Sequence, residues 1–188
     1  RRFPARRYRH CRCRCTGVGD GLHRPAAFPA LSMRTTFLTA VVAFMADQLT
    51  KLYVVVWLDL MTVRAIDVLP PFLNFRMAWN RGINFGLLSD DAELAKWALI
   101  AVSLAISTIV VLWVRRDGGG PMVQASAGML IGGALGNALD RFIYGAVADF
   151  LNMSCCGISN PFAFNIADVA IFAGAIGLIV FTGQKKSA

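Results

Sequence analysis

Residues 122–143 read MVQASAGMLIGGALGNALDRFI, and this stretch decides the fold class. Its length is about the 20 residues that an α-helix needs to cross ~30 Å of hydrocarbon. Gly128, Gly132 and Gly136 recur at every fourth position, the small-residue stripe of closely packed transmembrane helices. We interpret the stripe as a packing surface rather than as part of a reaction site.

Three further apolar stretches of similar length accompany it, at about residues 37–58, 96–114 and 162–183. The 188-residue chain is 56% hydrophobic and 16% charged, and its mean hydropathy of +0.56 is too high for an ordinary soluble domain. The sequence therefore predicts an all-α membrane protein with four transmembrane helices, at about 37–58, 96–114, 122–143 and 162–183.

Residues 1–32 differ in composition from the rest of the chain and show no apolar periodicity. Most of the excess positive charge lies there, on eight arginines: Arg1, Arg2, Arg6, Arg7, Arg9, Arg12, Arg14 and Arg24. We interpret residues 1–32 as a disordered or non-native leader, with translation starting at Met33, and residues 33–188 as the four-helix domain. The charge then gives no reason to expect a nucleic-acid partner.

The leader also holds Cys11, Cys13 and Cys15, a C-x-C-x-C pattern. Structural zinc prefers ligand pairs two to four residues apart with a second pair elsewhere, and no second pair follows. Cys155 and Cys156 are adjacent and imply no disulfide framework. We expect no metal and no cofactor.

The positive charges that flank the spans predict the topology. They precede the first span, separate the second from the third and follow the fourth, at Arg34, Arg115, Arg116, Lys185 and Lys186. Both termini are then cytoplasmic, and the segments 59–93 and 144–161 lie outside.

The first external segment contains a predicted strand. Large apolar residues occupy every second position from Leu73 to Trp79, which is the periodicity of a strand with one buried face. Pro70-Pro71 and Asn80-Arg81-Gly82 supply the breaks on either side. We expect a small external β element between the first two helices, and a free edge of this strand would suit pairing with an extended peptide.

Charged side chains within the spans need an explanation, because each costs about 2.5 to 3.5 kcal/mol at the centre of a membrane helix. Asp47 and Lys51 are four residues apart on one face of the first span, where we favour a structural ion pair over a direct chemical role. Asp140 stands beside Arg141 near the outer end of the third span, and charge compensation between these neighbours is one explanation of both.

Asp149 and Asp168 are predicted to lie at a similar depth. Asp149 falls at or just beyond the outer membrane boundary, and Asp168 about seven residues, or roughly 10 Å, below the start of the fourth span. Two carboxyl groups that share a proton can act as general base and general acid in peptide hydrolysis.

The alternative is a transporter or assembly factor in which four aspartates relay protons: Asp47, Asp140, Asp149 and Asp168. A relay predicts polar residues through the full membrane depth, whereas those of the third and fourth spans concentrate in the outer half.

Four motifs in order resemble the lipoprotein signal peptidases, also called signal peptidase II. They are Asp47-Gln48-Leu49-Thr50-Lys51, Asn80-Arg81-Gly82-Ile83-Asn84-Phe85-Gly86, the segment from Gly132 to Arg141 with Val147-Ala148-Asp149-Phe150, and Phe164-Asn165-Ile166-Ala167-Asp168. The resemblance covers essentially all of residues 33–188. Asn84 departs from it where a small residue is common, and Val169 where a serine is common.

The resemblance implies an aspartic endopeptidase of the bacterial inner membrane that cleaves diacylglyceryl-modified prolipoproteins just before the lipidated cysteine. It implies that Asp149 and Asp168 are the catalytic pair and that no cofactor is needed. It also implies a supporting or substrate-binding role for Asp47, Lys51, Asn80, Gly82, Asn137, Asp140, Arg141 and Asn165. The implied partners are lipid-modified prolipoproteins and membrane lipids. We expect a monomer whose active site lies near the periplasmic face.

Overall fold

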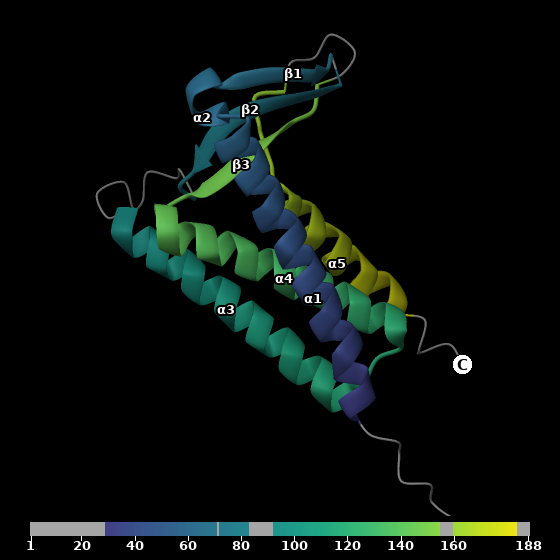
Figure 1. Ribbon diagram of the computed structural model, residues 1–188. Helices are drawn as coiled ribbons and strands as arrows, with labels where there is room; N and C mark the ends of the chain where they lie inside the picture. The colour runs from purple at the N-terminus through teal and green to yellow at the C-terminus, as the bar shows by residue number, and fades with distance from the viewer. Residues whose placement is uncertain (1–28, 71, 83–91, 155–159, 184–188) are drawn as a thin grey trace, which may run out of the picture.

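A computed structural model describes residues 29–70, 72–82, 92–154 and 160–183 (Figure 1). Several sequence interpretations lie outside these residues: the leader up to residue 28, Asn84, the adjacent Cys155 and Cys156, and the C-terminal Lys185 and Lys186.

Among the described residues, four helices are long and apolar enough to cross a membrane, in agreement with the predicted number. They are α1 (Pro29–Lys51) with its π-helical continuation η1 (Leu52–Trp57), α3 (Ala92–Asp117), α4 (Pro121–Tyr144) and α5 (Ile166–Gly183). Helix α1 begins ahead of Met33, inside the stretch that we assigned to the leader. A short helix, α2 (Leu60–Val63), follows η1. The arrangement is that of a multi-pass membrane protein.

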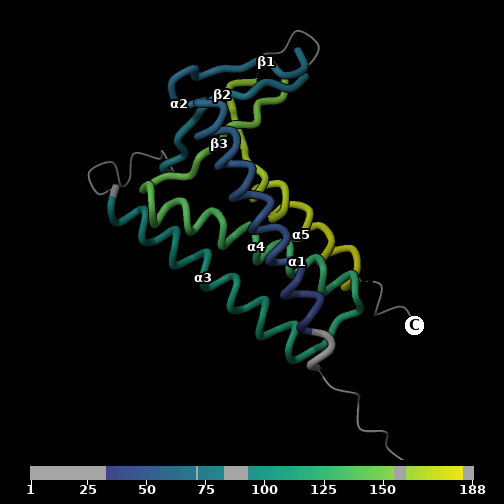
Figure 2. Tube along the Cα trace, in the orientation of Figure 1, coloured from purple at the N-terminus to yellow at the C-terminus, as the bar shows by residue number. Residues whose placement is uncertain are grey.

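Helix α4 is the centre of the bundle and packs against α1, α3 and α5 (Figures 1 and 2). Its glycines explain the close approach, since a Cβ atom at Gly128 would collide with Thr39 of α1 and one at Gly132 with the backbone of Ala40. On another face, a Cβ atom at Gly133 would collide with the carbonyl of Ala167 in α5. The stripe is therefore a packing surface, as the sequence predicted.

A three-stranded antiparallel sheet lies at one end of the bundle, which we call the sheet end (Figure 1). Its strands are β1 (Ala65–Leu69), β2 (Leu73–Asn80) and β3 (Val147–Asn152), in the order β1-β2-β3. The strand predicted from Leu73 to Trp79 is present, but the β element is not confined to the region between the first two long helices. Strand β2 is central, with β3 along one edge and β1 along the other from Leu73 to Arg76. The prediction of a free edge for peptide binding is therefore wrong for that part of the strand.

Strand β3 was missed because residues 147–152 show no alternation of apolar and polar side chains. Five of the six are buried, so both faces of the strand are covered. Phe150 is fully buried and meets Phe75 edge to face, with ring centroids 5.8 Å apart, beside Val54 and Leu60. This small core fixes the sheet to η1 and α2.

The fourth long helix begins later than predicted. The backbone of Phe164 pairs with Leu151 of β3, so residues 162–165 run beside the sheet and α5 starts at Ile166. Asp168 consequently lies in the first turn of α5, rather than about seven residues into a helix. The connection from β3 to α5 is closed at its base by the Nδ2 of Asn152, which donates to the carbonyls of Asn160 (2.7 Å) and Phe162 (2.9 Å).

Candidate active site

Asp149 is a buried carboxyl group on β3, with 3% of its surface exposed. Its Oδ1 accepts a hydrogen bond from Nδ2 of Asn165 (2.6 Å), and its Oδ2 accepts one from Nδ2 of Asn80 (3.1 Å). The register explains the second contact: Ala78 of β2 is the partner of Asp149, and Asn80 lies two positions along the same face.

Asp168 is half-buried in the first turn of α5. Its Oδ1 accepts from Nδ2 of Asn137 (2.8 Å), and its Oδ2 accepts from the backbone N–H of Asn165 (3.2 Å). In return, Oδ1 of Asn165 accepts from the backbone N–H of Asp168 (2.9 Å), which is the reciprocal arrangement of a capping box. Asp168 is thus held by hydrogen-bond donors at the N-terminal end of the helix.

The chain between the two acids is folded back so that both face one set of amides. The backbone N–H groups of Phe150 and Leu151 both donate to the carbonyl of Phe164, at 3.1 and 2.8 Å. This places Asn165 beside Asp149, and its Nδ2 also donates to Oδ1 of Asn137 (3.2 Å). The structure thus brings Asp149 and Asp168 into one hydrogen-bonded network through Asn165 and Asn137.

Burial first, and the neighbouring charge of Asp168 second, raise the pKa of Asp149 to about 6. The hydrogen bonds from Asn80 and Asn165 oppose this change but do not outweigh the loss of hydration. At neutral pH or just below it, Asp149 can therefore exchange a proton.

Asn80 is held by the turn that follows β2. Its Oδ1 accepts from the backbone N–H of Gly82 (3.0 Å), which leaves Nδ2 pointing to Asp149. Gly82 has a φ of +103°, a conformation that side-chain-bearing residues rarely adopt. The requirement for glycine at this position is thus a matter of backbone geometry next to Asn80.

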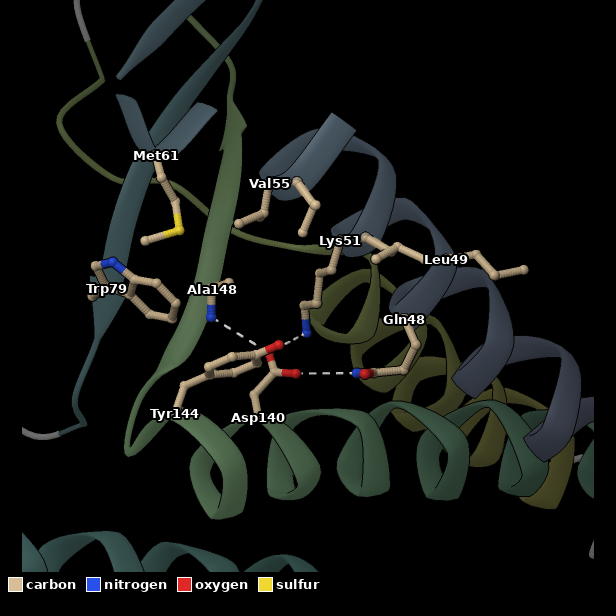
Figure 3. A pocket seen from close by; sticks show the side chains of 11 residues that line it. Gln48, Leu49, Lys51, Val55, Met61, Trp79, Asp140, Tyr144 and Ala148 are labelled. Carbon is tan, nitrogen blue, oxygen red and sulfur yellow. Dashed lines mark hydrogen bonds and ion pairs between the residues drawn. The ribbon is translucent and has the colours of Figure 1, made fainter. Parts of the chain in front are cut away.

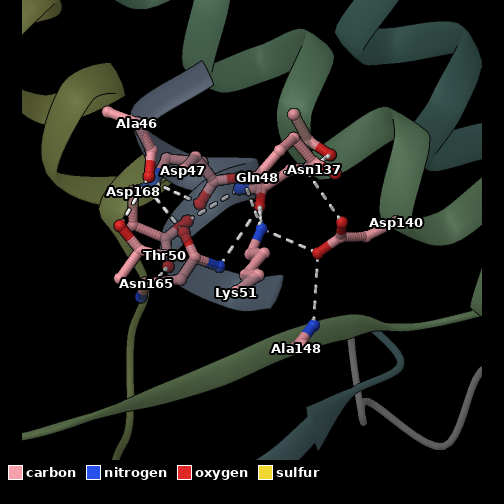
Figure 4. A network of polar contacts seen from close by, with 12 residues as sticks. Ala46, Asp47, Gln48, Thr50, Lys51, Asn137, Asp140, Ala148, Asn165 and Asp168 are labelled. Atoms are coloured by element: carbon pink, nitrogen blue, oxygen red, sulfur yellow. Dashed lines mark hydrogen bonds and ion pairs between the residues drawn. The ribbon is translucent and has the colours of Figure 1, made fainter. Parts of the chain in front are cut away.

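Asp47, Lys51 and Asp140 form a buried ion triad next to these amides (Figure 4). Nζ of Lys51 lies 2.7 Å from Oδ2 of Asp47 and 2.7 Å from Oδ2 of Asp140. The three residues are 0%, 6% and 1% exposed, in chain order. The Asp47–Lys51 pair is as predicted, but the salt bridge of Asp140 is to Lys51 and not to its neighbour Arg141.

Arg141 instead turns toward Asp149 and Asp168, which we call the dyad. Its Nη1 donates to the carbonyl of Asn137 (3.1 Å), and its positive charge interacts with Asp149 and Asp168. Its buried Nε has no hydrogen-bond partner among the described residues. An unsatisfied buried donor is costly, so this N–H is suited to a ligand that the protein alone does not supply.

Gln48 is a member of the polar network to which the sequence analysis gave no role. Its Nε2 donates to Oδ2 of Asp47 and to Oδ1 of Asp140, both at 3.1 Å. An amide inside an apolar span is itself an uncommon feature, and that signal was available in the motif that runs from Asp47 to Lys51.

Two largely apolar cavities adjoin the polar centre. One, of about 380 Å³, opens between α1, the sheet and the end of α4 (Figure 3), where Trp79 and Met61 stand opposite Lys51 and Asp140. The other, of about 330 Å³, lies between α3, α4 and α5, and Asn137 and Arg141 line it together with apolar side chains such as Leu99 and Ile171. Within the described parts of the chain, no cluster of three or more metal-ligating side chains occurs.

Proteins similar in sequence to this chain are named lipoprotein signal peptidases. The family model for signal peptidase (SPase) II matches residues 39–183. A lipoprotein signal peptidase of Methylorubrum extorquens (strain PA1) is 40% identical over 150 residues, which cover 78% of this chain and 86% of the relative. One from Nitrobacter hamburgensis is 36% identical, with 78% and 90% covered. A solved structure described as "Bacterial membrane enzyme structure by the in meso method at 1.9 A resolution" is 28% identical with a TM-score of 0.67, and the match covers 83% of this chain and 96% of that chain.

Proposed function

The chain belongs to the signal peptidase (SPase) II family, and we propose that it removes signal peptides from lipid-modified prolipoproteins with Asp149 and Asp168 as its catalytic pair. The observation that carries the proposal is that one side chain, Asn165, contacts both acids. Its Nδ2 donates to Asp149, and its Oδ1 accepts from the backbone N–H of Asp168 at the start of α5. Two carboxyl groups are thereby held in one buried, amide-lined setting, which is the arrangement that aspartic peptide hydrolysis requires.

The environments of the two acids assign their roles. Asp149 has a raised pKa and supplies the proton, whereas Asp168 is surrounded by donors and acts as the base. Asp168 takes a proton from water as the water oxygen attacks the scissile carbonyl carbon, and Asp149 donates its proton to the carbonyl oxygen. As the tetrahedral intermediate collapses, Asp168 gives its proton to the leaving amine and Asp149 takes one back from a hydroxyl group of the intermediate, which restores the starting protonation of the pair.

Arg141 supports this chemistry by holding the substrate. Its unpaired buried Nε can donate to a carbonyl of the extended segment at the cleavage site. The apolar walls of the two cavities suit acyl chains and the signal helix, which would enter laterally from the bilayer. The proposed substrate carries a diacylglyceryl group on the cysteine that follows the scissile bond.

We place the protein in the bacterial inner membrane as a monomer, with both termini cytoplasmic and the dyad near the periplasmic face. Arg115 and Arg116 support this orientation, because they are exposed at the end of α3 that lies opposite the sheet. Water would reach the dyad from the periplasmic side.

A proton relay is less compatible with the positions of the four aspartates. Asp47, Asp140, Asp149 and Asp168 all belong to the cluster at the sheet end, through Lys51, Asn137 and Asn165. A relay through the membrane needs polar groups along its whole depth. Among the described residues, Gly128 and Gly132 in the opposite half of the α1–α4 contact meet only uncharged partners: Thr36, Thr39, Ala40 and Ala43.

The proposal is tested by comparing the full chain with its Asp149→Asn and Asp168→Asn variants on a diacylglyceryl-modified prolipoprotein, followed by gel shift. We expect loss of cleavage in both variants, because an amide can neither donate the acid proton nor act as the base. The matched control is Asp59→Asn, an exposed aspartate with a φ of +47° that asparagine tolerates. Retained cleavage in either dyad variant would contradict the assignment.

A further inference from the structure

Each proposed catalytic aspartate follows an alanine whose backbone N–H is bound by the ion triad. The N–H of Ala167, next to Asp168, donates to Oδ1 of Asp47 at 2.9 Å. The N–H of Ala148, next to Asp149, donates to Oδ2 of Asp140 at 3.4 Å (Figure 4). The two chain segments that carry the dyad are therefore attached, one residue before each acid, to the two carboxylates of the triad.

Lys51 links those two carboxylates. Its Nζ contacts Asp47 and Asp140 at 2.7 Å each, and it also donates to Oδ1 of Asn137 at 3.5 Å. Asn137 in turn donates to Asp168 from its Nδ2. A continuous path of ionic and hydrogen-bonded contacts thus runs from the start of α5, through α1 and α4, to β3.

A glycine on the surface of α4, Gly136, leaves room for this path. A Cβ atom at Gly136 would lie 2.8 Å from Oδ2 of Asp47, so glycine leaves the room that the carboxylate occupies. Burying three charges costs desolvation energy that apolar side chains of similar size avoid, so holding helices together does not explain them. The hydrogen bonds from the backbones of Ala148 and Ala167 to the two carboxylates do explain the buried charges.

We propose that Lys51 is a positioning residue whose ion triad fixes the distance between Asp149 and Asp168 by clamping the backbone in front of each. This inference rests on the proposed function, since it assigns how the dyad is held. Removal of Lys51 leaves two carboxylates that repel each other, and the two backbone segments then lose their common anchor. A misplacement of about 1 Å is enough to lower a catalytic rate roughly 100-fold.

Lys51 and Asp140 also line the cavity between α1 and the sheet (Figure 3), so direct contact with substrate is the competing role. The two roles differ in what they change. A positioning residue acts on the chemical step and lowers kcat, whereas a residue that binds substrate and transition state equally raises KM.

The experiment measures kcat and KM for a diacylglyceryl-modified prolipoprotein with the full chain and its Lys51→Met and Lys51→Arg variants. Lys96→Met is the matched control, because it removes a lysine ion pair of the same 2.7 Å length on α3, with Glu93, away from the dyad. We expect Lys51→Met to lower kcat about 100-fold at a KM within about twofold of the parent. Lys51→Arg should recover part of the loss, and Lys96→Met should match the parent.

A kcat of Lys51→Met within about threefold of the parent, or a raised KM at unchanged kcat, would overturn the clamp. If Lys51→Met is recovered only unfolded, Asp140→Ala decides in its place, since it removes the anchor of Ala148 and leaves the Asp47–Lys51 pair. Loss of kcat there supports the clamp, and the parent's kcat overturns it. Cleavage by the dyad variants, by contrast, would refute the proposed function itself.

Discussion

Helices α1 and α4 touch along their length, but they are joined by different means at the two ends. Away from the sheet, Gly128 and Gly132 bring the backbones together against Thr39 and Ala40. At the sheet end, the same two helices meet through the buried ion triad. Close backbone packing is enough to hold membrane helices together. The charges at the sheet end therefore serve the placement of β3 and α5. Three predictions test whether the sheet end positions the dyad while the opposite end only packs the helices.

The largest effect is expected from Asn165→Ala. It removes the donor shared by Asp149 and Asn137 and the acceptor for the N–H of Asp168, so we expect kcat to fall about 100-fold and the free energy of unfolding to fall by about 1–3 kcal/mol. Cleavage kinetics and thermal unfolding in detergent measure the two. Ser107→Ala is the control, because it removes another buried hydrogen bond, to the carbonyl of Ser103, outside the dyad. If Asn165→Ala and Ser107→Ala lowered kcat equally, the sheet end would have no special role in catalysis.

The second effect concerns pH. A carboxyl group with a raised pKa of about 6 keeps its proton below that pH and loses it above, so a protonated Asp149 becomes rarer as the pH rises. We expect kcat/KM, which reports the free enzyme, to fall by about tenfold per unit above roughly pH 6. The described ionisable residues at the far ends of α1 and α3 are exposed: Arg34, Arg115, Arg116 and Asp117. A kcat/KM that instead rises through pH 6 to a plateau would make the ionised form of Asp149 the active one.

The smallest change in kcat is expected from a comparison of two glycines, each of which ends a helix in a left-handed conformation. Gly145 (φ +75°) ends α4 beside β3, and Gly118 (φ +52°) ends α3 at the opposite end of the bundle. A Cβ atom would meet nothing within 4 Å at either position, so alanine should cost about 1 kcal/mol of stability at both, through backbone strain alone. We expect only Gly145→Ala to lower kcat, by a few-fold, because Gly145 joins Asp140 to Asp149. A similar loss of kcat in Gly118→Ala would show that the regions are not separate.

The sequence predicted the features that depend on long or regular apolar patterns. The four spans and the strand from Leu73 to Trp79 are such features, and both patterns are set by burial on one face or by the membrane. Strand β3 is covered on both faces and carries no alternation, so its pairing with β2 was not predictable. The later start of α5 follows from Phe164 pairing with β3, a contact between segments that no local pattern reports.

The sequence predicted which residues belong to the polar centre better than it predicted which of them pair with each other. Charges inside spans identified Asp47, Lys51 and Asp140, but the nearest neighbour in the chain, Arg141, was the wrong partner for Asp140. The link from Lys51 depends on how closely α1 and α4 approach, which is a property of the packed helices. Asn165 entered only through the resemblance, and its hydrogen bond with Asn137 required the structure.

The two hydrogen bonds from Asn152 have a practical meaning for protein engineering. Because they hold Asn160 and Phe162 against the end of β3, we expect an insertion between Asn152 and Asn160 to leave both ends of the connection in place. An affinity tag or a fluorescent label inserted there would sit between the two dyad aspartates in the chain, and we expect cleavage to survive the insertion. The segment is thus a site for reporting on the enzyme while it works.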